Sequence, residues 1–186
     1  MRPVKFDQSQ LHRVAEFSCG DQPWEIEVAQ WIKAPRGQGG ALDDLSNPAF
    51  NIEVWLYESP SNELIGYGAL GTSRWTFPDT NNKRTSRIVQ IIPFLGVQKT
   101  YWGQPASKPK QEQFAYLIMG DLLARASDHW FHDTKKYSPI LGLCVHPNNA
   151  RAIKFYQNWG FSDLGANKSG HLRKYINVDG GQRDWI

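Results

Sequence analysis

An apolar stretch from Ile88 to Val97 is the feature of this 186-residue sequence that most restricts its fold. Its composition predicts a strand, but Pro93 and Gly96 lie inside it. Proline cannot donate a ladder hydrogen bond, and both residue types are typical of bulges and sheet edges. We therefore expect this strand to break, or to splay away from its neighbour, near its end.

The sequence after this stretch predicts a second strand that pairs with the first. Residues from Gln111 to about Trp130 carry an apolar stripe at helical spacing, and Ile140–Val145 is apolar throughout. Because a helical crossover joins parallel strands, we expect 88–97 and 140–145 to be parallel. Where they splay apart, main-chain groups would be free to pair with an extended ligand that has amides of its own. An ordinary bulge is the structural alternative.

The other patterns complete a mixed α/β fold. We expect a helix with Asp21 as its N-cap, an antiparallel hairpin of 52–57 and 64–70, a helix opening at 147–149 and ending at Gly160, and short final strands near 161 and 171–178. Together they predict a single domain, residues 1–186. Its central sheet is mostly antiparallel with one splayed parallel pair, and helices cover both faces.

Composition excludes several classes of protein. Lys and Arg number 21 against 18 Asp and Glu, and a net charge of +3 is too small for a strongly basic nucleic-acid wrapper. Aromatic residues make up 13%, which is too many for a disordered chain. No apolar run approaches a membrane span, and two distant cysteines form no disulfide framework. We expect a soluble, cytoplasmic protein.

Positive charge is concentrated between residues 81 and 111. This segment has no Asp or Glu and six basic residues: Lys83, Arg84, Arg87, Lys99, Lys108 and Lys110. It leads into the expected helix, whose first N–H groups can bind an anion. A polyphosphate ligand and a solvated basic loop both fit this pattern, and nucleic-acid binding by the segment is a further alternative.

A motif follows the strand at 140–145: Asn149-x-Arg151-Ala152-Ile153-x-Phe155-Tyr156-x-x-x-Gly160-Phe161. It closely resembles the C-terminal motif of the GNAT superfamily of acyl-CoA-dependent N-acyltransferases. The similarity extends back to about Ile88 and, less closely, to 52–70. The resemblance implies a GNAT-like fold and an enzyme that transfers an acetyl group from acetyl-CoA to a primary amine by direct attack.

The resemblance also implies where coenzyme A would bind. Leu95-Gly96-Val97 looks like the family tripeptide whose main chain holds the pantetheine arm, and Asn149 looks like a residue that contacts the cofactor or caps its helix. The phosphate loop matches residues 110–115, which implies contacts from Lys110, Gln111, Gln113, Phe114 and Ala115. Gln113 stands where the family has a glycine, so a side chain lies where the main chain would approach phosphate.

Tyr156 is implied as the catalytic general acid that protonates the departing thiolate. The alternative is that its ring only packs with Phe155 and Trp159. The glutamate that many members carry on the splayed strand is missing, because no carboxylate lies between Asp79 and Glu112. His146 is a candidate base or plain structure. An α-amine has a pKa near 8, so part of it is already neutral, and it depends less on a general base than a lysine acceptor does.

The acceptor stays open among a small molecule, a protein amine and aminoacyl-tRNA, the one nucleic acid expected as a substrate. A Phe17-x-Cys19-Gly20 entry to the first helix looks like that of a GNAT subgroup with toxins that acetylate aminoacyl-tRNA. A homodimer also stays open. We expect no metal at His129-x-x-His132, which lacks a third ligand, and an inert, buried Cys144.

A hypothesis of a different class is a catalytically inactive GNAT-fold module with a binding or regulatory role. Gln113 and the missing carboxylate favour it.

Overall fold

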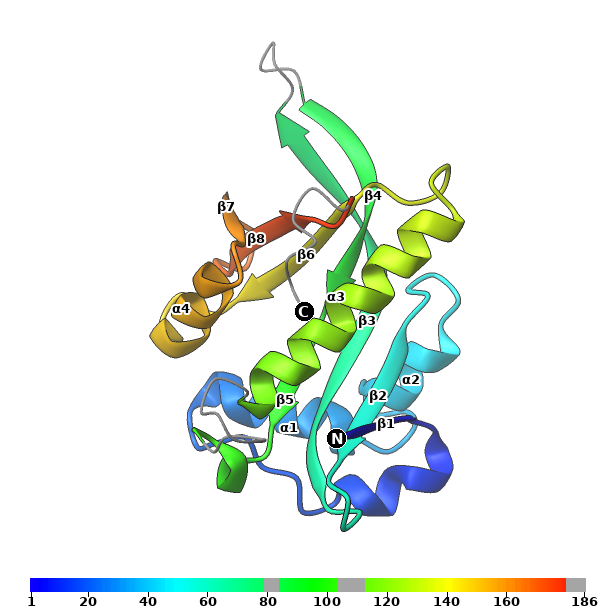
Figure 1. Cartoon of the computed structure of the whole chain (residues 1–186), viewed down its shortest axis with the longest axis vertical. Coiled ribbons are helices and arrows are strands. Elements are labelled where there is room, and N and C mark those ends of the chain that lie inside the picture. The colour runs from blue at the N-terminus through cyan, green and yellow to red at the C-terminus, as the bar shows by residue number, and fades with distance from the viewer. Residues whose placement is uncertain (79–83, 104–112, 180–186) are drawn as a thin grey trace. The chain divides into compact units, whose positions relative to one another are not determined.

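The structure is a computed structural model that describes residues 1–78, 84–103 and 113–179. The chain divides into two compact units, one of Met1–Leu70 with Phe94–Leu122 and the other of Gly71–Pro93 with Leu123–Ile186. Two elements, β3 and α3, pass through both units (Figure 1). A single domain over residues 1–186 stays a prediction.

The elements follow one another as β1 (Arg2–Lys5), η1 (Gln8–Val14), α1 (Pro23–Lys33), α2 (Ala41–Ser46), β2 (Glu53–Glu58), β3 (Leu64–Pro78), β4 (Arg84–Ile92), β5 (Leu95–Val97), η2 (Lys99–Tyr101), α3 (Phe114–His132), β6 (Ile140–Val145), α4 (Ala150–Asn158), β7 (Ser162–Ala166) and β8 (Leu172–Asn177). The sequence did not predict β1, η1 and α2. Each has four to seven residues, which is too short for a clear periodicity.

Strand pairing confirms the expected mixed sheet. In the described part of the chain eight strands take part, in the order β1-β2-β3-β4-β6-β8-β7, with β5 paired to β3. Every pair is antiparallel except β4–β6. That parallel pair is short, because only residues 90–92 lie beside 141–143. Within residues 1–78, 84–103 and 113–179, no helix is long and apolar enough to cross a membrane.

The predicted break in the apolar strand separates β4 from β5. Both pair with β3, but their registers differ. The chain advances four residues from Ile91 to Leu95, whereas its partners on β3 move back only three, from Gly71 to Gly68. The extra residue is a β-bulge. It coincides with Pro93, which has no N–H to offer to a ladder.

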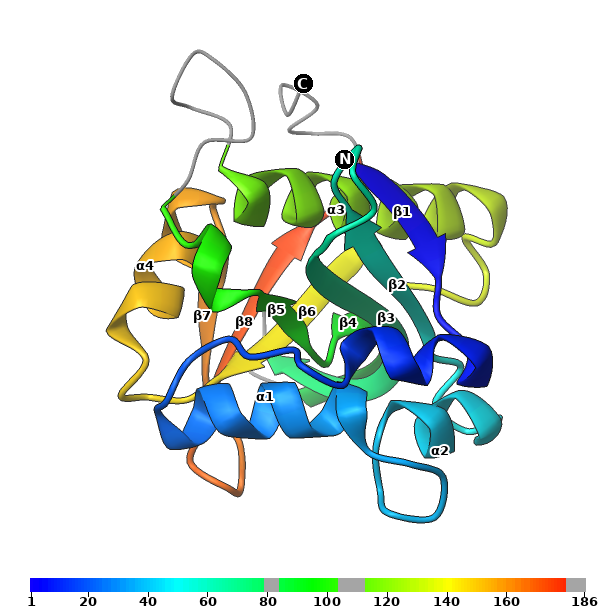
Figure 2. The ribbon, with the colours of Figure 1, turned by 90° about the horizontal axis from the view of Figure 1, so that it is seen from below.

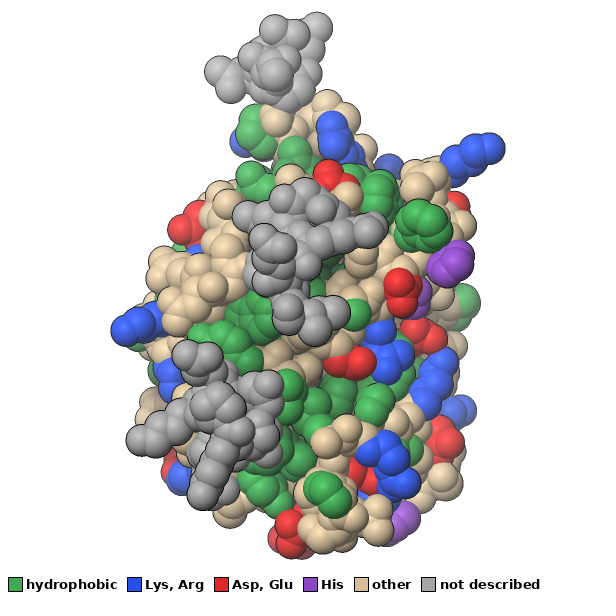
Figure 3. All heavy atoms as spheres, in the orientation of Figure 1, with side chains coloured by type: hydrophobic (Ala, Val, Ile, Leu, Met, Phe, Trp, Pro, Cys, Tyr) green, Lys and Arg blue, Asp and Glu red, His purple; other side chains and the backbone are tan. Residues whose placement is uncertain are grey.

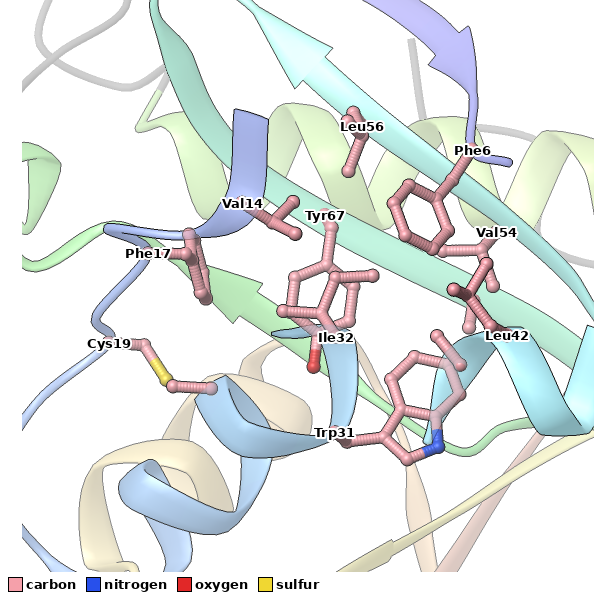
Figure 4. Packing of buried hydrophobic residues seen from close by; sticks show 13 residues of the cluster. Phe6, Val14, Phe17, Cys19, Trp31, Ile32, Leu42, Val54, Leu56 and Tyr67 are labelled. Carbon is pink, nitrogen blue, oxygen red and sulfur yellow. The ribbon is translucent and has the colours of Figure 1, made fainter. Parts of the chain in front are cut away.

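Tyr67 lies at the centre of the core of the first unit (Figure 4). It is fully buried, and its hydroxyl donates a hydrogen bond of 2.6 Å to the carbonyl of Val28. Phe17 meets its ring edge-on at 5.4 Å, and Trp31 stacks at 5.8 Å from it and at 4.4 Å from Phe94. Burial of such rings contributes a few kcal/mol each, about 1.5–3 kcal/mol by area. Phe94, which directly follows Pro93, is therefore held in place by this core.

Helices lie on opposite faces of the strands in the first unit (Figure 2). On one face, α1 packs near β5 and the buried rings. On the other face the first half of α3 approaches β3 closely. A Cβ added to Gly66 would lie 3.0 Å from Ile118 Cδ1, and one added to Gly68 would lie 2.8 Å from Leu122 Cδ1. These two glycines let helix and sheet approach each other.

The N-cap of α1 is Gln22, so the prediction of Asp21 is wrong. The Glu25 carboxylate accepts a 3.0 Å hydrogen bond from the N–H of Gln22, in the manner of a capping box. Asp21 instead forms an ion pair with Lys99. The helix begins one residue later because Pro23 takes its first position, where no N–H is required.

The second unit is built on β4, β6, β8 and the outer part of β3. The second half of α3 covers one face, where Gln90 Nε2 donates a 2.6 Å hydrogen bond to the carbonyl of Ala126. The other face carries a buried cluster of Trp75, Phe77, Val89 and Ile140. Strand alternation assigns Gln90 and these apolar residues to opposite faces.

Glu58 ends β2 as a fully buried carboxylate. It pairs with Arg2 at 2.5 Å and also with Arg13. Burial alone would raise the pKa of Glu58, but the hydrogen bonds and charges of the two arginines outweigh burial and lower it. The folded state therefore favours the ionised carboxylate.

We expect Glu58→Gln to lower the free energy of unfolding by about 1–3 kcal/mol at neutral pH, because a buried charged hydrogen bond is lost. Glu53 pairs with Lys5 and is more exposed than Glu58, so Glu53→Gln should change the free energy of unfolding by about 0.5 kcal/mol or less. The lowered folded-state pKa stabilises the fold above about pH 4.3, and this is lost as pH falls through that pKa. Urea unfolding at several pH values measures both effects. A wild-type advantage over Glu58→Gln that persists unchanged in acid would contradict the assignment.

Candidate functional site

The predicted cofactor tripeptide Leu95–Val97 forms β5, an antiparallel partner of β3. The residues on either side of β5 bond to β3 at 3.0 and 2.7 Å. By the alternation of an antiparallel ladder, the main chain of Gly96 faces β3, while the N–H groups of Leu95 and Val97 point away from it. Among the described residues, neither of these N–H groups has a partner. An extended chain with its own amides can bind there.

Gly96 serves packing rather than outward contact. A Cβ at this position would lie 2.9 Å from the ring of Tyr67 and 3.0 Å from Phe17 and Val28. The space on this side is filled by the core. The outward donors of β5 are therefore those of its first and last residues. The sequence analysis did not single out Trp102, whose indole N–H donates a 2.9 Å hydrogen bond to the Val97 carbonyl.

The first turn of α3, in the same unit, is the position of the predicted anion site. Phe114 starts the helix, and the carbonyl of Gln113 accepts its first main-chain hydrogen bonds. No acidic residue lies in this turn. Its leading N–H groups lack partners within the helix, which suits an anion. Gln113 is exposed and Ala115 half-buried, while Lys110 and Gln111 lie outside the described residues.

In the second unit, β6 extends beyond its parallel partner. The β4–β6 ladder stops at Ile92 and Leu143, whereas β6 continues to Val145. By ladder alternation, the carbonyl of Cys144 faces the edge from which β4 has departed, because its neighbours in β6 bond to β8. The expected parting of the strands is therefore present in the pairing.

The expectation that Cys144 is buried is wrong, because its side chain is exposed. It lies past the last residue of β6 that pairs with β4, near the open end of the strand. Partial desolvation raises the pKa of the Cys144 thiol and outweighs the opposite effects of Arg173 and Asn167. A raised pKa keeps the thiol protonated, so the expected lack of reactivity is still favoured.

Asn149 is the N-cap of α4. Its side-chain oxygen accepts a 3.0 Å hydrogen bond from the N–H of Ala152. This satisfies one of the N–H groups that have no partner within the helix. The capping alternative for Asn149 is therefore realised, and contact with a cofactor stays a prediction.

The other end of α4 is closed by Gly160, as predicted. Its φ of 83° lies in the left-handed region, which other residues rarely adopt. Its N–H donates to the Gln157 carbonyl at 2.9 Å, and the Phe161 N–H donates to the Tyr156 carbonyl at 3.0 Å. These two hydrogen bonds together form a Schellman motif, which fixes the last turn of α4, on which Tyr156 lies.

Aromatic rings surround Tyr156. Phe155 and Phe161 meet its ring edge-on at 5.3 and 5.7 Å. The residue as a whole is half-buried, and desolvation raises the pKa of its phenol to about 12. Its hydroxyl makes no hydrogen bond to the described residues. The phenol therefore keeps its proton across neutral pH and can donate it to another group.

His146 is poorly suited to the role of base. Its Nδ1 accepts a 3.2 Å hydrogen bond from the N–H of Asn148, and the ring of His171 lies 5.6 Å away. A neutral ring in this geometry carries its proton on Nε2, and its lone pair is already engaged.

Among the described residues, no group of three or more His, Cys, Asp or Glu could hold a metal ion.

The predicted site residues fall into two groups. The first unit holds Leu95, Gly96, Val97, Gln113, Phe114 and Ala115, whereas Asn149 and Tyr156 lie on one helix of the second unit. The basic segment is also divided: Lys99 is paired with Asp21 in the first unit, and Arg84 and Arg87 lie on β4 in the second. Lys83 and Lys108 lie outside the described residues.

Substitution of Asn149 can separate capping from cofactor contact. We expect Asn149→Ala to cost about 1 kcal/mol of stability, because the cap is lost. Asn149→Asp should restore stability, since aspartate also caps. Asn148→Ala, beside it, serves as a near-neutral control. Thermal unfolding measures the series, and an unchanged melting temperature for Asn149→Ala would contradict the cap. A loss of acetyl-CoA affinity in Asn149→Asp would show a second role.

Comparison with known proteins relates this geometry to solved structures. No family model matches the sequence, and no curated protein matches it. A tyrosine-to-phenylalanine mutant of the toxin AtaT, solved with acetyl-CoA and the C-terminus of the antitoxin AtaR, aligns with TM-score 0.63 at 10% identity, covering 95% of this chain and 92% of the other.

Two further structures agree. A tyrosine-to-phenylalanine mutant of KacT aligns with TM-score 0.65 at 13% identity, covering 95% and 94% of the chains. A Klebsiella pneumoniae protein assigned to the acyl-CoA N-acyltransferases aligns with TM-score 0.56 at 13% identity, covering 95% and 97%. At these identities the likeness concerns the fold. The chain therefore has the GNAT fold that its sequence motif resembles.

Proposed function

We propose that this chain is an N-acetyltransferase that transfers an acetyl group from acetyl-CoA to a primary amine by direct attack. The observation that carries the proposal is the pair of outward-facing N–H groups on β5, where the strand has separated from β4. The GNAT fold supports it, as does the acetyl-CoA present in the AtaT complex.

The described residues of the first unit fit the chemistry of coenzyme A. Its pantetheine arm is extended and carries two amides, which suit the N–H groups of Leu95 and Val97. Its phosphates suit the first turn of α3, which has no acidic residue. When bound, acetyl-CoA supplies the acetyl thioester that the amine attacks. Lys110, Gln111, Gln113, Phe114 and Ala115 remain proposed phosphate contacts, with Asn149 as a further cofactor contact.

Tyr156 is the proposed general acid. Its phenol holds a proton that no described residue of the chain engages, and its pKa of about 12 keeps that proton in place. A leaving thiolate is a stronger base than water and can take the proton as it departs. The edge-on rings of Phe155 and Phe161 fix the orientation of the phenol.

Neither the described residues of β4 and β5 nor His146 provide a clear general base. Among the described residues of β4 and β5 there is no carboxylate, and the Nδ1 of His146 is engaged. This favours an acceptor that is partly neutral at pH 7, such as an α-amine, over a lysine. A small molecule, a protein N-terminus and aminoacyl-tRNA all meet this condition. We place the reaction in the cytoplasm, where cysteines without a disulfide are usual.

A catalytically inactive binding module is the second candidate, because Gln113 replaces the expected glycine. Calorimetry with acetyl-CoA, followed by thiol release with a panel of amines, separates the two. Binding with thiol release supports the enzyme. Binding without turnover for any amine, or no binding together with no thiol release, removes the enzyme and leaves the module.

We expect Tyr156→Phe to lower turnover about 100-fold while the KM for acetyl-CoA changes about twofold or less, because only the proton donor is lost. Tyr175→Phe, whose ring packs on Phe77 in the same unit, should keep full turnover. Wild-type turnover should not decline through ionisation of Tyr156 until the pH nears its pKa of about 12. Thiol release measures all three. Equal rates for Tyr156→Phe and the wild type would remove Tyr156 from the mechanism.

A further inference from the structure

The outer part of the β3–β4 hairpin is a basic two-stranded segment, here called the ribbon and defined as residues 72–78 and 84–90. It extends beyond β6 and β8 of its own unit (Figure 1). Arg74, Arg84 and Arg87 lie on it and are exposed. Its described residues include five Ser or Thr and no Asp or Glu. In Figure 3, Lys and Arg side chains lie where the described parts of β3 and β4 end.

One face of the ribbon is anchored in its own unit. Trp75 and Phe77 are buried, with exposed fractions of 8% and 9%. The Phe77 ring meets Tyr175 of β8 edge-on at 5.8 Å, and Trp75 lies against Gly142, where a Cβ would come within 2.6 Å of the indole. These contacts stabilise the ribbon as a fixed part of the sheet.

The opposite face is polar and open. Register pairs place Arg74 beside Ile88, Thr76 beside Ser86, and Pro78 beside Arg84. All six of these residues are exposed. Alternation along each strand directs them away from the anchored face. The ribbon therefore presents two guanidinium groups and two hydroxyls on its open face, whereas Arg87, the register partner of Trp75, is exposed on the edge of the anchored face.

The three arginines have no carboxylate partner among the described residues. Other basic residues of the chain do, such as Lys99 with Asp21 and Lys174 with Asp163. Residues 71–92 contain four basic residues and one acidic residue, so their net charge of +3 equals that of the whole chain. The rest of the chain is neutral overall, so this hairpin carries a local excess of positive charge that can attract an anionic partner.

The spacing favours a polymer over a small anion. Arg74 and Pro78, the register partner of Arg84, are four residues apart on β3. At about 3.3 Å per residue the two guanidinium groups attach about 13 Å apart. Side chains attached this far apart can contact separate phosphates of one strand. Arginine and hydroxyl side chains are typical donors to a phosphodiester backbone.

We propose that the ribbon binds the phosphodiester backbone of a nucleic acid. The site differs from the basic segment 81–111 considered from sequence alone. Arg74 joins it from β3, whereas Lys99 is occupied by Asp21. An anionic membrane is less suitable, because Ile88 is the one large apolar side chain on the open face. The proposal does not depend on acetyl transfer.

Fluorescence anisotropy with the full chain tests the proposal. The probes are labelled duplexes of about 20 base pairs, one RNA and one DNA of matching sequence, titrated between about 20 and 200 mM KCl. We expect the logarithm of the affinity to fall with the logarithm of salt with a slope of about −2 if Arg74 and Arg84 alone contact phosphates, and of about −3 if Arg87 contacts a third. Tighter binding of either duplex supports the proposal and identifies the source of the phosphates.

Substitutions locate the site. The triple variant Arg74→Gln, Arg84→Gln, Arg87→Gln should lose affinity about 10-fold or more at low salt, and each single variant should reduce the slope by about one. A charge-matched control, Arg36→Gln, Lys135→Gln, Lys168→Gln, removes three exposed charges elsewhere and should retain affinity within about threefold. Melting temperatures should stay near that of the wild type for both, since all six side chains are exposed.

Three results would overturn the proposal. The first is no binding of either duplex by the wild type at the lowest salt. The second is an equal loss of affinity in the ribbon variant and the control, which would reflect net charge alone. The third is stronger ribbon-dependent binding to anionic lipid vesicles than to either duplex. Thiol release is measured separately, so a chain without acetyltransferase activity could still satisfy every ribbon prediction.

Discussion

The structure depends on the hydrogen bond that Pro93 cannot make. A β-bulge at this proline shifts the register against β3 by one residue, and Phe94 beside it stacks on Trp31 in the core of the first unit. The missing donor and the buried ring act together. The first interrupts the ladder with β3 at the bulge, where the β4–β6 ladder also ends after three residue pairs, and the second commits β5 to β3.

This separation is what leaves main-chain donors of the sheet directed outward. A continuous strand would satisfy its own main-chain groups, whereas β5 directs the N–H groups of Leu95 and Val97 away from its partner. In the second unit the same event leaves the end of β6 uncovered, and the following helix carries Tyr156. Caps at both ends of α4, Asn149 and Gly160, fix that helix independently of any ligand.

The same hairpin that leads into the bulge carries the positive charge of the chain. Its inner face is anchored by Trp75 and Phe77, so its arginines are presented on a fixed surface. Neutral surroundings elsewhere make this charge asymmetric. A protein of small net charge can therefore have a local site for a polyanion, since binding follows the local distribution of charge.

The sequence alone determined the features that depend on local chemistry. The break at Pro93, the parallel strand 140–145, the glycine end of α4 and the GNAT motif all follow from residue type and spacing. Short elements such as α2, the true N-cap of α1 and the exposure of Cys144 were decided by tertiary structure. Tertiary structure also decided the charges of the predicted basic segment. Lys99 is paired with Asp21, and Arg74 lies on β3, beside the strand that carries Arg84 and Arg87. The physical reason is that capping, burial and ion pairing depend on which groups the fold brings within a few ångströms, and spacing along the chain does not contain that information.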